Sequence, residues 1–206
     1  MEHSSKKRKP GRPKGAASVE TMGHILRVAA FQFMDLGFEK VSLAGVAKAC
    51  GVTKASVYYY FPNKSELFTS ALLFVMQVAY NSSAKIIESD APLKDRMLEL
   101  AVKHMSNAHV EFETMMREAS PALSEEQVRQ IRESEGALHL LLGQMFRSEM
   151  DKGVIVECDH HLLAHTFTAA LSVRNRKELI NEHKTVAQAA EEIIELLLKG
   201  ITPRPE

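Results

Sequence analysis

Apolar residues recur at intervals of three and four along most of this chain, and that spacing places them on one face of an α-helix. The first such stripe consists of Met22, Ile25, Leu26, Ala29 and Phe33. It predicts a helix that begins at Ser18 and ends near Gly37, because glycine is favoured just past the end of a helix. We see no alternation of apolar and polar residues of the kind that marks a half-buried strand.

Capping residues divide the next part of the chain into three helices. Ser42, Thr53 and Asn63 each carry a side-chain oxygen that can accept a hydrogen bond from the first turn of a helix. Gly51 supplies the stop between the first two. The helices expected here cover residues 43–50, 54–60 and 64 to about 85–88.

Capping residues also mark the starts of helices in the second half of the chain. Ser124 with Gln127, and Thr185 with Gln188, form capping boxes at the starts of two helices. The helices expected here cover residues 93 to about 104–110, a turn or two around 112–116, then 125–152, 160–173 and 186–200. Together with the first four, they predict an all-α fold of about nine helices.

Residues 43–61, LAGVAKACGVTKASVYYYF, meet the requirements of a helix-turn-helix. Ala47 is small where the two helices cross, Gly51 lies in the turn, and Val52 and Val57 point inward. That arrangement leaves these side chains available to DNA: Thr53, Lys54, Ala55, Ser56, Tyr58 and Tyr59.

Three consecutive tyrosines end this motif, and they could all be core aromatics instead. Consecutive helical residues are about 100° apart, so Tyr58, Tyr59 and Tyr60 cannot all point inward. We therefore place Tyr58 on DNA and Tyr60 in the core.

Charge is distributed unevenly along a chain whose formal net charge is zero. Residues 1–64 hold 11 Lys and Arg against 4 Asp and Glu, so this part carries +7 and the remainder −7. A basic end joined to an acidic remainder is typical of a protein that offers one end to phosphates.

The first 17 residues are basic and rich in Pro and Gly, which predicts a flexible arm. Residues 9–14, KPGRPK, resemble an AT-hook, in which a Gly-Arg-Pro core lies in a narrow A·T minor groove. Pro10 replaces the basic residue that usually precedes the glycine. The alternative is a polybasic tail that only neutralises phosphates. In both interpretations Arg12 and Lys14 contact DNA.

From Ile25 to Leu72 the sequence closely resembles the TetR family of bacterial regulators, over about a quarter of the chain. Its segment GVTKASVYYYFPNK is similar to the family's recognition-helix signature. The resemblance implies that Ser56 and Tyr58 face base edges or phosphates and that Tyr59 packs on the sugar-phosphate backbone. It also implies that Lys64 holds a phosphate at a helix N-terminus.

The same resemblance implies that the C-terminal domain carries a ligand cavity and a dimer interface. The last two helices of the sequence are rich in apolar residues, more than one small domain readily buries, so we expect them to pair with a second copy as a four-helix bundle. The candidate residues of the ligand pocket are Phe74, Met97, His104, Met105, Phe112, Met116, Leu138, His139, Leu142, Met145 and Phe146. The alternative is that these apolar residues pack in the hydrophobic core and line no ligand pocket.

Several classes of function are not expected. The sequence has no Gly-rich phosphate loop and no nucleophile–base pattern, so we do not expect an enzyme or a cofactor. Cys158, His161 and His165 share a helix face, but three ligands on one helix make a weak metal signal, and we expect no metal. The most apolar stretch, residues 67–80, is shorter than the roughly 20 residues that span a bilayer, so we expect a soluble cytoplasmic protein.

These observations predict three parts: a flexible basic arm (1–17), a helix-turn-helix DNA-binding domain (18–65) and a helical effector-binding and dimerisation domain (66–206). The function that they favour is a ligand-responsive homodimeric repressor that binds a palindromic DNA operator through the major groove. Its partners are double-stranded DNA, a second copy and a small-molecule effector. The alternatives are an architectural binder of A·T-rich DNA and, less favoured, a metal-responsive regulator.

Overall fold

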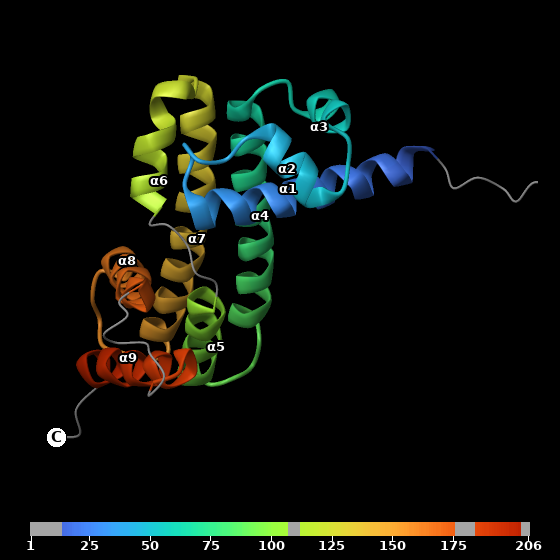
Figure 1. Ribbon diagram of the computed structural model, residues 1–206. Helices are drawn as coiled ribbons and strands as arrows, with labels where there is room; N and C mark the ends of the chain where they lie inside the picture. Colours follow the sequence, from blue (N-terminus) through green and yellow to red (C-terminus); the bar gives the residue numbers. More distant parts are fainter. Residues whose placement is uncertain (1–13, 107–111, 176–183, 203–206) are drawn as a thin grey trace, which may run out of the picture.

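The computed structural model describes residues 14–106, 112–175 and 184–202, and Arg12 of the expected arm lies outside them. Within these ranges the chain forms nine α-helices and two short 3₁₀ helices (Figure 1). They are α1 (Lys14–Leu36), α2 (Leu43–Cys50), α3 (Lys54–Tyr60), α4 (Lys64–Ile87), α5 (Leu93–Met105), α6 (Phe112–Ala119), η1 (Ser120–Ala122), α7 (Glu125–Asp151), α8 (His160–Leu171), η2 (Ser172–Asn175) and α9 (Val186–Ile201). The all-α fold of about nine helices is confirmed.

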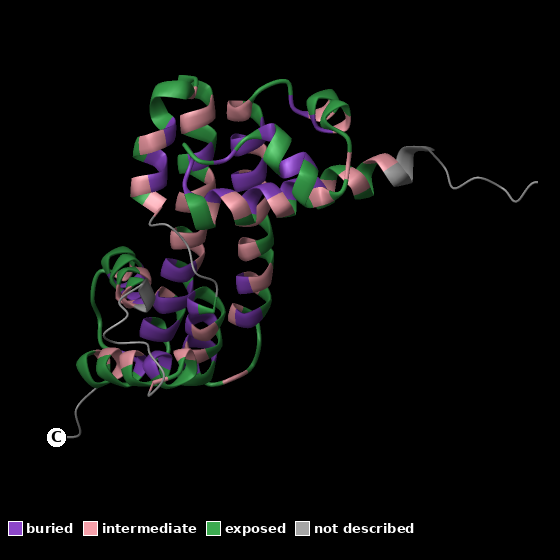
Figure 2. Ribbon diagram, in the orientation of Figure 1, coloured by how far each residue is buried: buried purple, intermediate pink, exposed green. Residues whose placement is uncertain are grey.

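Two long helices, α4 and α7, run side by side and join the two ends of the molecule (Figure 1). At one end they pack with α1, α2, α3 and α6. At the other end they meet α5, α8 and α9, with α9 lying against α5. Figure 2 shows the buried residues on the facing sides of these helices.

Each end has its own hydrophobic core. At the first end, the rings of Phe33 and Phe38 both meet Phe68 edge to face, with centroids 5.0 Å apart. The same core includes Met116 of α6 and Ile131 of α7. The expected boundary between residues 65 and 66 falls inside α4, so the core around the helix-turn-helix draws on helices from both expected domains.

The helix ends follow the caps that the sequence predicts. Ser42, Thr53 and Asn63 each accept a hydrogen bond from the backbone of the following helix. Gly37 and Gly51 have φ of +81° and +66°, a left-handed conformation in which a side chain would be strained. Both capping boxes, at Ser124 and at Thr185, are formed.

Three details differ from the expectation. Helix α1 begins at Lys14, four residues before Ser18, because Ala16 and Ala17 favour helix and the single Gly15 only weakens it. Helix α9 continues through Gly200 to Ile201, because a single glycine only weakens a helix. Met22 is 36% exposed, since the inward face of α1 begins only at Ile25. In the described ranges no helix is both long and apolar enough to cross a membrane.

Candidate nucleic-acid interface

The helix-turn-helix is held from beneath by two valines. Val46 of α2 and Val57 of α3 are fully buried in the core of this end, and Ala47 is buried where the helices cross. The turn is closed by a hydrogen bond of 3.1 Å from the backbone N–H of Val52 to the carbonyl of Ala47. Because α3 is anchored on one side only, its opposite face is left to solvent.

The exposed face of α3 carries the six side chains that the sequence left available to DNA: Thr53, Lys54, Ala55, Ser56, Tyr58 and Tyr59. All lie at the surface, and only Ser56 is half-buried. Tyr59 is 81% exposed and Tyr58 44% exposed. The ammonium of Lys54 lies 5.5 Å from the centre of the Tyr58 ring, so a positive charge and an aromatic ring stand together on this face.

Two of the six are already engaged with each other. The Thr53 side chain accepts a hydrogen bond of 3.1 Å from the backbone N–H of Ser56, and the two hydroxyl oxygens are 2.8 Å apart. Thr53 therefore caps α3 as well as facing solvent. The hydroxyl of Ser56 can still accept from a partner, since an oxygen with two lone pairs is not exhausted by one bond.

Tyr60, which we expected in the core, is half-buried at its edge. Its hydroxyl lies 2.8 Å from the hydroxyl of Ser18 on α1 and also 3.3 Å from the Ser18 carbonyl, to which it can donate. The expectation that Tyr60 points away from the reading face is consistent with this contact. Nothing in the sequence pattern signalled its partner.

Lys64 lies at the first position of α4 but is turned inward. Its ammonium donates a hydrogen bond of 3.0 Å to the carbonyl of Glu39 and lies 4.4 Å from the centre of the Phe38 ring. These contacts fix the loop between α1 and α2 onto α4. Lys14 is the first residue of α1; a phosphate contact by it or by Arg12 stays a prediction.

Three hydrogen bonds connect α6, η1 and α7 to the loop after α1 and to the start of α4. They lie at the end of the molecule that contains α1, α2 and α3, which we call the helix-turn-helix end. The Glu118 carboxylate accepts from the backbone N–H of Phe38 at 3.1 Å. The Ser65 hydroxyl donates to the carbonyl of Ala122 at 2.7 Å, and the Gln127 amide donates to the Glu66 carboxylate at 3.0 Å. Sequence reasoning missed all three, because each joins residues more than fifty positions apart.

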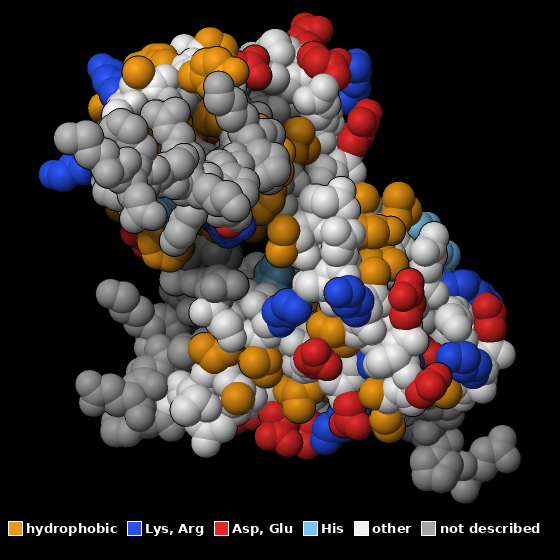
Figure 3. All heavy atoms as spheres, turned by 90° about the vertical axis from the view of Figure 1, so that its right-hand side faces the viewer, with side chains coloured by type: hydrophobic (Ala, Val, Ile, Leu, Met, Phe, Trp, Pro, Cys, Tyr) orange, Lys and Arg blue, Asp and Glu red, His pale blue; other side chains and the backbone are white. Residues whose placement is uncertain are grey.

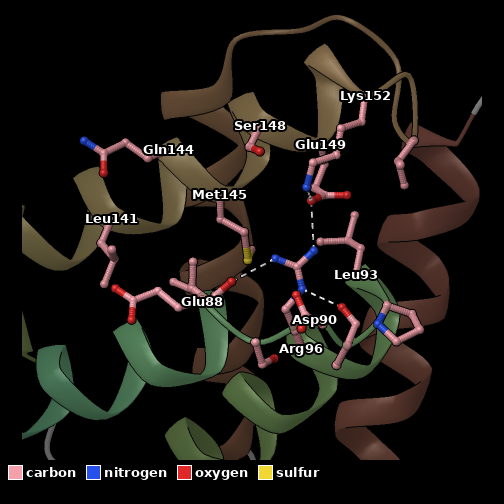
Figure 4. Close-up of a pocket in the computed structure, with 15 residues that line it drawn as sticks. Glu88, Asp90, Leu93, Arg96, Leu141, Gln144, Met145, Ser148, Glu149 and Lys152 are labelled. Atoms are coloured by element: carbon pink, nitrogen blue, oxygen red, sulfur yellow. Dashed lines mark hydrogen bonds and ion pairs between the residues drawn. The ribbon is translucent and has the colours of Figure 1, made fainter.

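The end of the molecule that contains α5, α8 and α9 is called the helical end below. It contains a pocket of about 720 Å³ beside the turn between α4 and α5 (Figure 4). Arg96 lies at its centre and donates to the carbonyls of Ile87 and Ala91 at 3.1 and 2.9 Å and to the Glu149 carboxylate at 2.9 Å. One wall comes from α7, through Leu141, Gln144, Met145 and Ser148. Its volume is in the range of small-molecule sites.

The pocket residues expected from the sequence are not gathered there. Met145 is the one member of that set that lines it. The others divide between the two cores: Phe74, Phe112 and Met116 pack at the helix-turn-helix end, and Met97, Met105, Leu138, Leu142 and Phe146 pack at the helical end. His104 is exposed. Periodicity identified the inward faces correctly but could not tell which core each face joins, so their role in ligand binding stays a prediction.

Two histidines, His139 of α7 and His165 of α8, meet where these helices pack together. The rings of His139 and His165 stack with centroids 4.1 Å apart, and Nε2 of His139 lies 3.1 Å from the Thr168 hydroxyl. Burial, together with the neighbouring His165, lowers the pKa of His139. Cys158 is exposed and precedes α8. In the part of the chain that the structure describes, no three His, Cys, Asp or Glu side chains are grouped to hold a metal ion.

Charge over the helical end is mixed. On the face of the molecule that Figure 3 displays, acidic and basic side chains lie close together across the lower part. Surface pairs include Lys94 with Glu195, 3.5 Å apart, where α5 meets α9. This part of the surface does not present the single positive sign that a phosphate backbone requires.

Residues 25–71 match the family model of bacterial regulatory proteins of the tetR family. The chain is 46% identical over 50 residues to the HTH-type transcriptional regulator AcrR of Shigella flexneri. It is also 34% identical over 71 residues to the HTH-type transcriptional regulator TtgR of Pseudomonas putida. These matches cover 24% and 34% of this chain and only 23% and 33% of the two relatives.

Comparison with solved structures covers most of the chain, including the helical end. The reduced form of Escherichia coli NemR superposes with a TM-score of 0.72 at 17% identity, over 90% of this chain and all of that one. Residues 25–71 are therefore similar to the tetR-family regulators, and the whole chain shares its fold with NemR. A second structure with a similar fold, the transcriptional regulator FadR of Bacillus subtilis in complex with stearoyl-CoA, has a TM-score of 0.70 at 19% identity, over 86% of this chain and 97% of that one.

Proposed function

We propose that this chain is a DNA-binding transcriptional regulator, a ligand-responsive homodimeric repressor that binds a palindromic operator through the major groove. The observation that carries the proposal is the face of α3, where Lys54 lies over Tyr58 and Tyr59 is largely exposed. A short helix anchored by buried valines and presenting cationic and aromatic side chains suits the width of the major groove.

The DNA contacts that we propose come from three places. Base edges and nearby phosphates meet Thr53, Lys54, Ala55, Ser56, Tyr58 and Tyr59 on α3. The basic arm adds Arg12 and Lys14. Lys64 adds a phosphate contact at the N-terminus of α4, for which its ammonium must leave the Glu39 carbonyl.

The homodimer is proposed through α8 and α9, and the structure changes which residues support it. Leu163, Phe167 and Ile194 are buried within one chain, so they do not need a partner. Leu162 of α8 is 64% exposed and Leu196 of α9 is 71% exposed. A second copy packed on these helices would remove both leucines from water, which stabilises association.

The effector is proposed to bind the helical end. FadR of Bacillus subtilis, which shares this fold, is seen with stearoyl-CoA, and AcrR and TtgR are transcriptional regulators. The bonds of Glu118, Ala122 and Gln127 link α6, η1 and α7 to the helix-turn-helix end. A ligand that moves α6 or α7 therefore changes how α3 is presented.

Genome-wide mapping of bound sites, followed by footprinting of the strongest site, tests this function against the architectural alternative. The proposal predicts a few strong sites, each with two half-sites about one helical turn apart. Broad coating of A·T-rich DNA without a defined footprint would support the architectural binder instead and would contradict the proposal.

A further inference from the structure

The pocket at the helical end lies where two helices end and a third begins. Its lining includes Ile87, the last residue of α4, and Lys152, which caps the end of α7. A helix C-terminus carries about half a negative charge, because its last carbonyls have no partners within the helix. Leu93, the first residue of α5, brings one helix N-terminus of the opposite sign. Two negative helix ends therefore face one positive end across a space of about 720 Å³.

The charged side chains of the pocket add to this negative excess. Its two cations, Arg96 and Lys152, both donate to the same oxygen of Glu149, at 2.9 and 2.7 Å. The other two charged residues of the lining, Glu88 and Asp90, are exposed and form no ion pair with any residue that the structure describes. Three carboxylates thus stand against two cations, and the cations are the groups that already have a partner.

An apolar wall stands beside the unpaired carboxylates. Leu141 and Met145 lie one turn apart on α7 and both line the pocket. Met145 is buried, whereas Leu141 is only half-buried. Figure 4 shows the Glu88 side chain on the Leu141 side of the pocket, with Arg96 on the other side. A ligand that covers Leu141 would remove more of its apolar surface from water, which favours binding.

We propose that this pocket binds organic cations that carry an apolar group, with the positive centre near Glu88 and Asp90 and the apolar group against Leu141. The inference rests on the proposed function, because it names the chemical class of the effector. An anion of the same shape would meet the two free carboxylates and both helix C-termini. The Arg96 guanidinium, which would have to attract that anion, already donates to Glu149 and to two backbone carbonyls.

The test is isothermal titration calorimetry of the full chain, without DNA and in sodium buffer, with tetraphenylphosphonium and tetraphenylborate as the two probes. These ions have the same shape and apolar surface but opposite charge, so the ratio of their Kd values measures the charge preference of the pocket alone. We expect tetraphenylphosphonium to bind about tenfold more tightly. The ratio should shrink as the salt concentration rises, because the carboxylates that set it are exposed.

Three variants separate the charge of the pocket from its apolar wall. Glu88→Gln should raise the Kd of tetraphenylphosphonium about threefold, the scale of one exposed charge pair. Glu88→Lys should abolish the preference for the cation and should fold normally, since a lysine suits a helix C-terminus. Leu141→Ser should weaken both ions alike, because it removes apolar surface and no charge.

Glu125→Gln is the matched control for the charge variants. Glu125 is exposed, as Glu88 is, but it lies at the opposite end of α7 from the pocket. Its replacement should leave the Kd of both ions unchanged. Equal thermal unfolding midpoints for wild type and the Glu88 variants confirm that binding, and not folding, has changed.

The inference is overturned if the two ions bind equally well, if neither binds, or if Glu88→Gln binds the cation as tightly as wild type. Failure of the proposed function looks different, because it is measured separately by fluorescence anisotropy on the mapped operator. A chain that binds tetraphenylphosphonium with the expected preference, but keeps its operator affinity at saturating concentrations of the ion, would support the pocket and contradict the ligand response.

Discussion

At the scale of single residues, the helical end buries a charged pair. Arg96 and Glu149 are 7% and 3% exposed, and Lys152 adds a second cation 2.7 Å from the same Glu149 oxygen. The guanidinium also donates to the carbonyl of Ile87 at the end of α4 and to that of Ala91 in the following turn, so it fixes the turn between α4 and α5 onto α7. A buried pair costs desolvation, and removing one partner leaves the other uncompensated.

Glu149→Gln should therefore lower the free energy of unfolding by about 3 kcal/mol at neutral pH, as measured by urea denaturation. Burial alone raises the pKa of Glu149, but hydrogen bonds from Lys152 and Arg96 outweigh it and hold the pKa below its usual value. The stabilisation is therefore present above the pKa of the unfolded chain and is lost as the pH falls through the lower folded pKa.

The control for this variant is Glu195→Gln, which breaks a pair exposed by 46% on each side and should cost less than about 1 kcal/mol. The gap between wild type and Glu149→Gln should close as the pH falls from about 7 to about 3. A gap that stays constant over that range would contradict the role assigned to the Glu149 carboxylate.

At the scale of elements, the loop between α1 and α2 is held from two sides. Glu118 of α6 accepts from the N–H of Phe38, while Lys64 of α4 donates to the carbonyl of Glu39. Gly37 directly precedes Phe38, and a Cβ at Gly37 would come within 2.8 Å of the Glu118 carboxylate. The loop that supports α2 therefore depends on α6, which lies more than seventy residues further along the chain.

Glu118→Ala should weaken operator binding about threefold to tenfold, because a half-buried backbone N–H loses its acceptor and the loop loosens. Fluorescence anisotropy on the mapped operator measures this effect. Glu113→Ala is the matched control: it removes another glutamate of α6 whose partner is the exposed Arg132, and it should leave binding unchanged. If both variants bind alike, the contact with Phe38 does not carry the coupling.

Local signals explain how much of the elements the sequence could predict. Helix ends with their own caps, such as those at Ser42, Thr53 and Ser124, were placed correctly because the cap and its partner are neighbours in sequence. The partners of Lys64, Tyr60 and Glu118 could not be found in this way. Each depends on how helices distant in the sequence pack together.

At the scale of the whole molecule, the fold class followed from periodicity, but the division into cores did not. An apolar stripe shows that a helix face is buried and leaves its partner open. Met116 and Ile131 illustrate this, since they belong to the core of the helix-turn-helix end although they lie far along the chain. For the same reason the expected pocket residues proved to be divided between two cores.

The proposed dimer makes a prediction at this scale. The double variant Leu162→Glu with Leu196→Glu should give folded monomers, because both side chains are exposed in one chain but become buried, unpaired carboxylates in a dimer. Val19→Glu, at a residue 67% exposed on α1, is the control and should remain dimeric. Sedimentation velocity at micromolar concentration decides; a variant that stays dimeric places the interface elsewhere.

The central claim is that α3 reads DNA, and the affinity of Tyr58→Ala for the mapped operator tests it most directly. Fluorescence anisotropy at fixed salt should show a loss of about 1 to 3 kcal/mol per half-site, with no change in the thermal unfolding midpoint because the ring is 44% exposed. Tyr80→Phe should bind as wild type does. Unchanged operator affinity in Tyr58→Ala would contradict the assignment of α3 as the recognition helix.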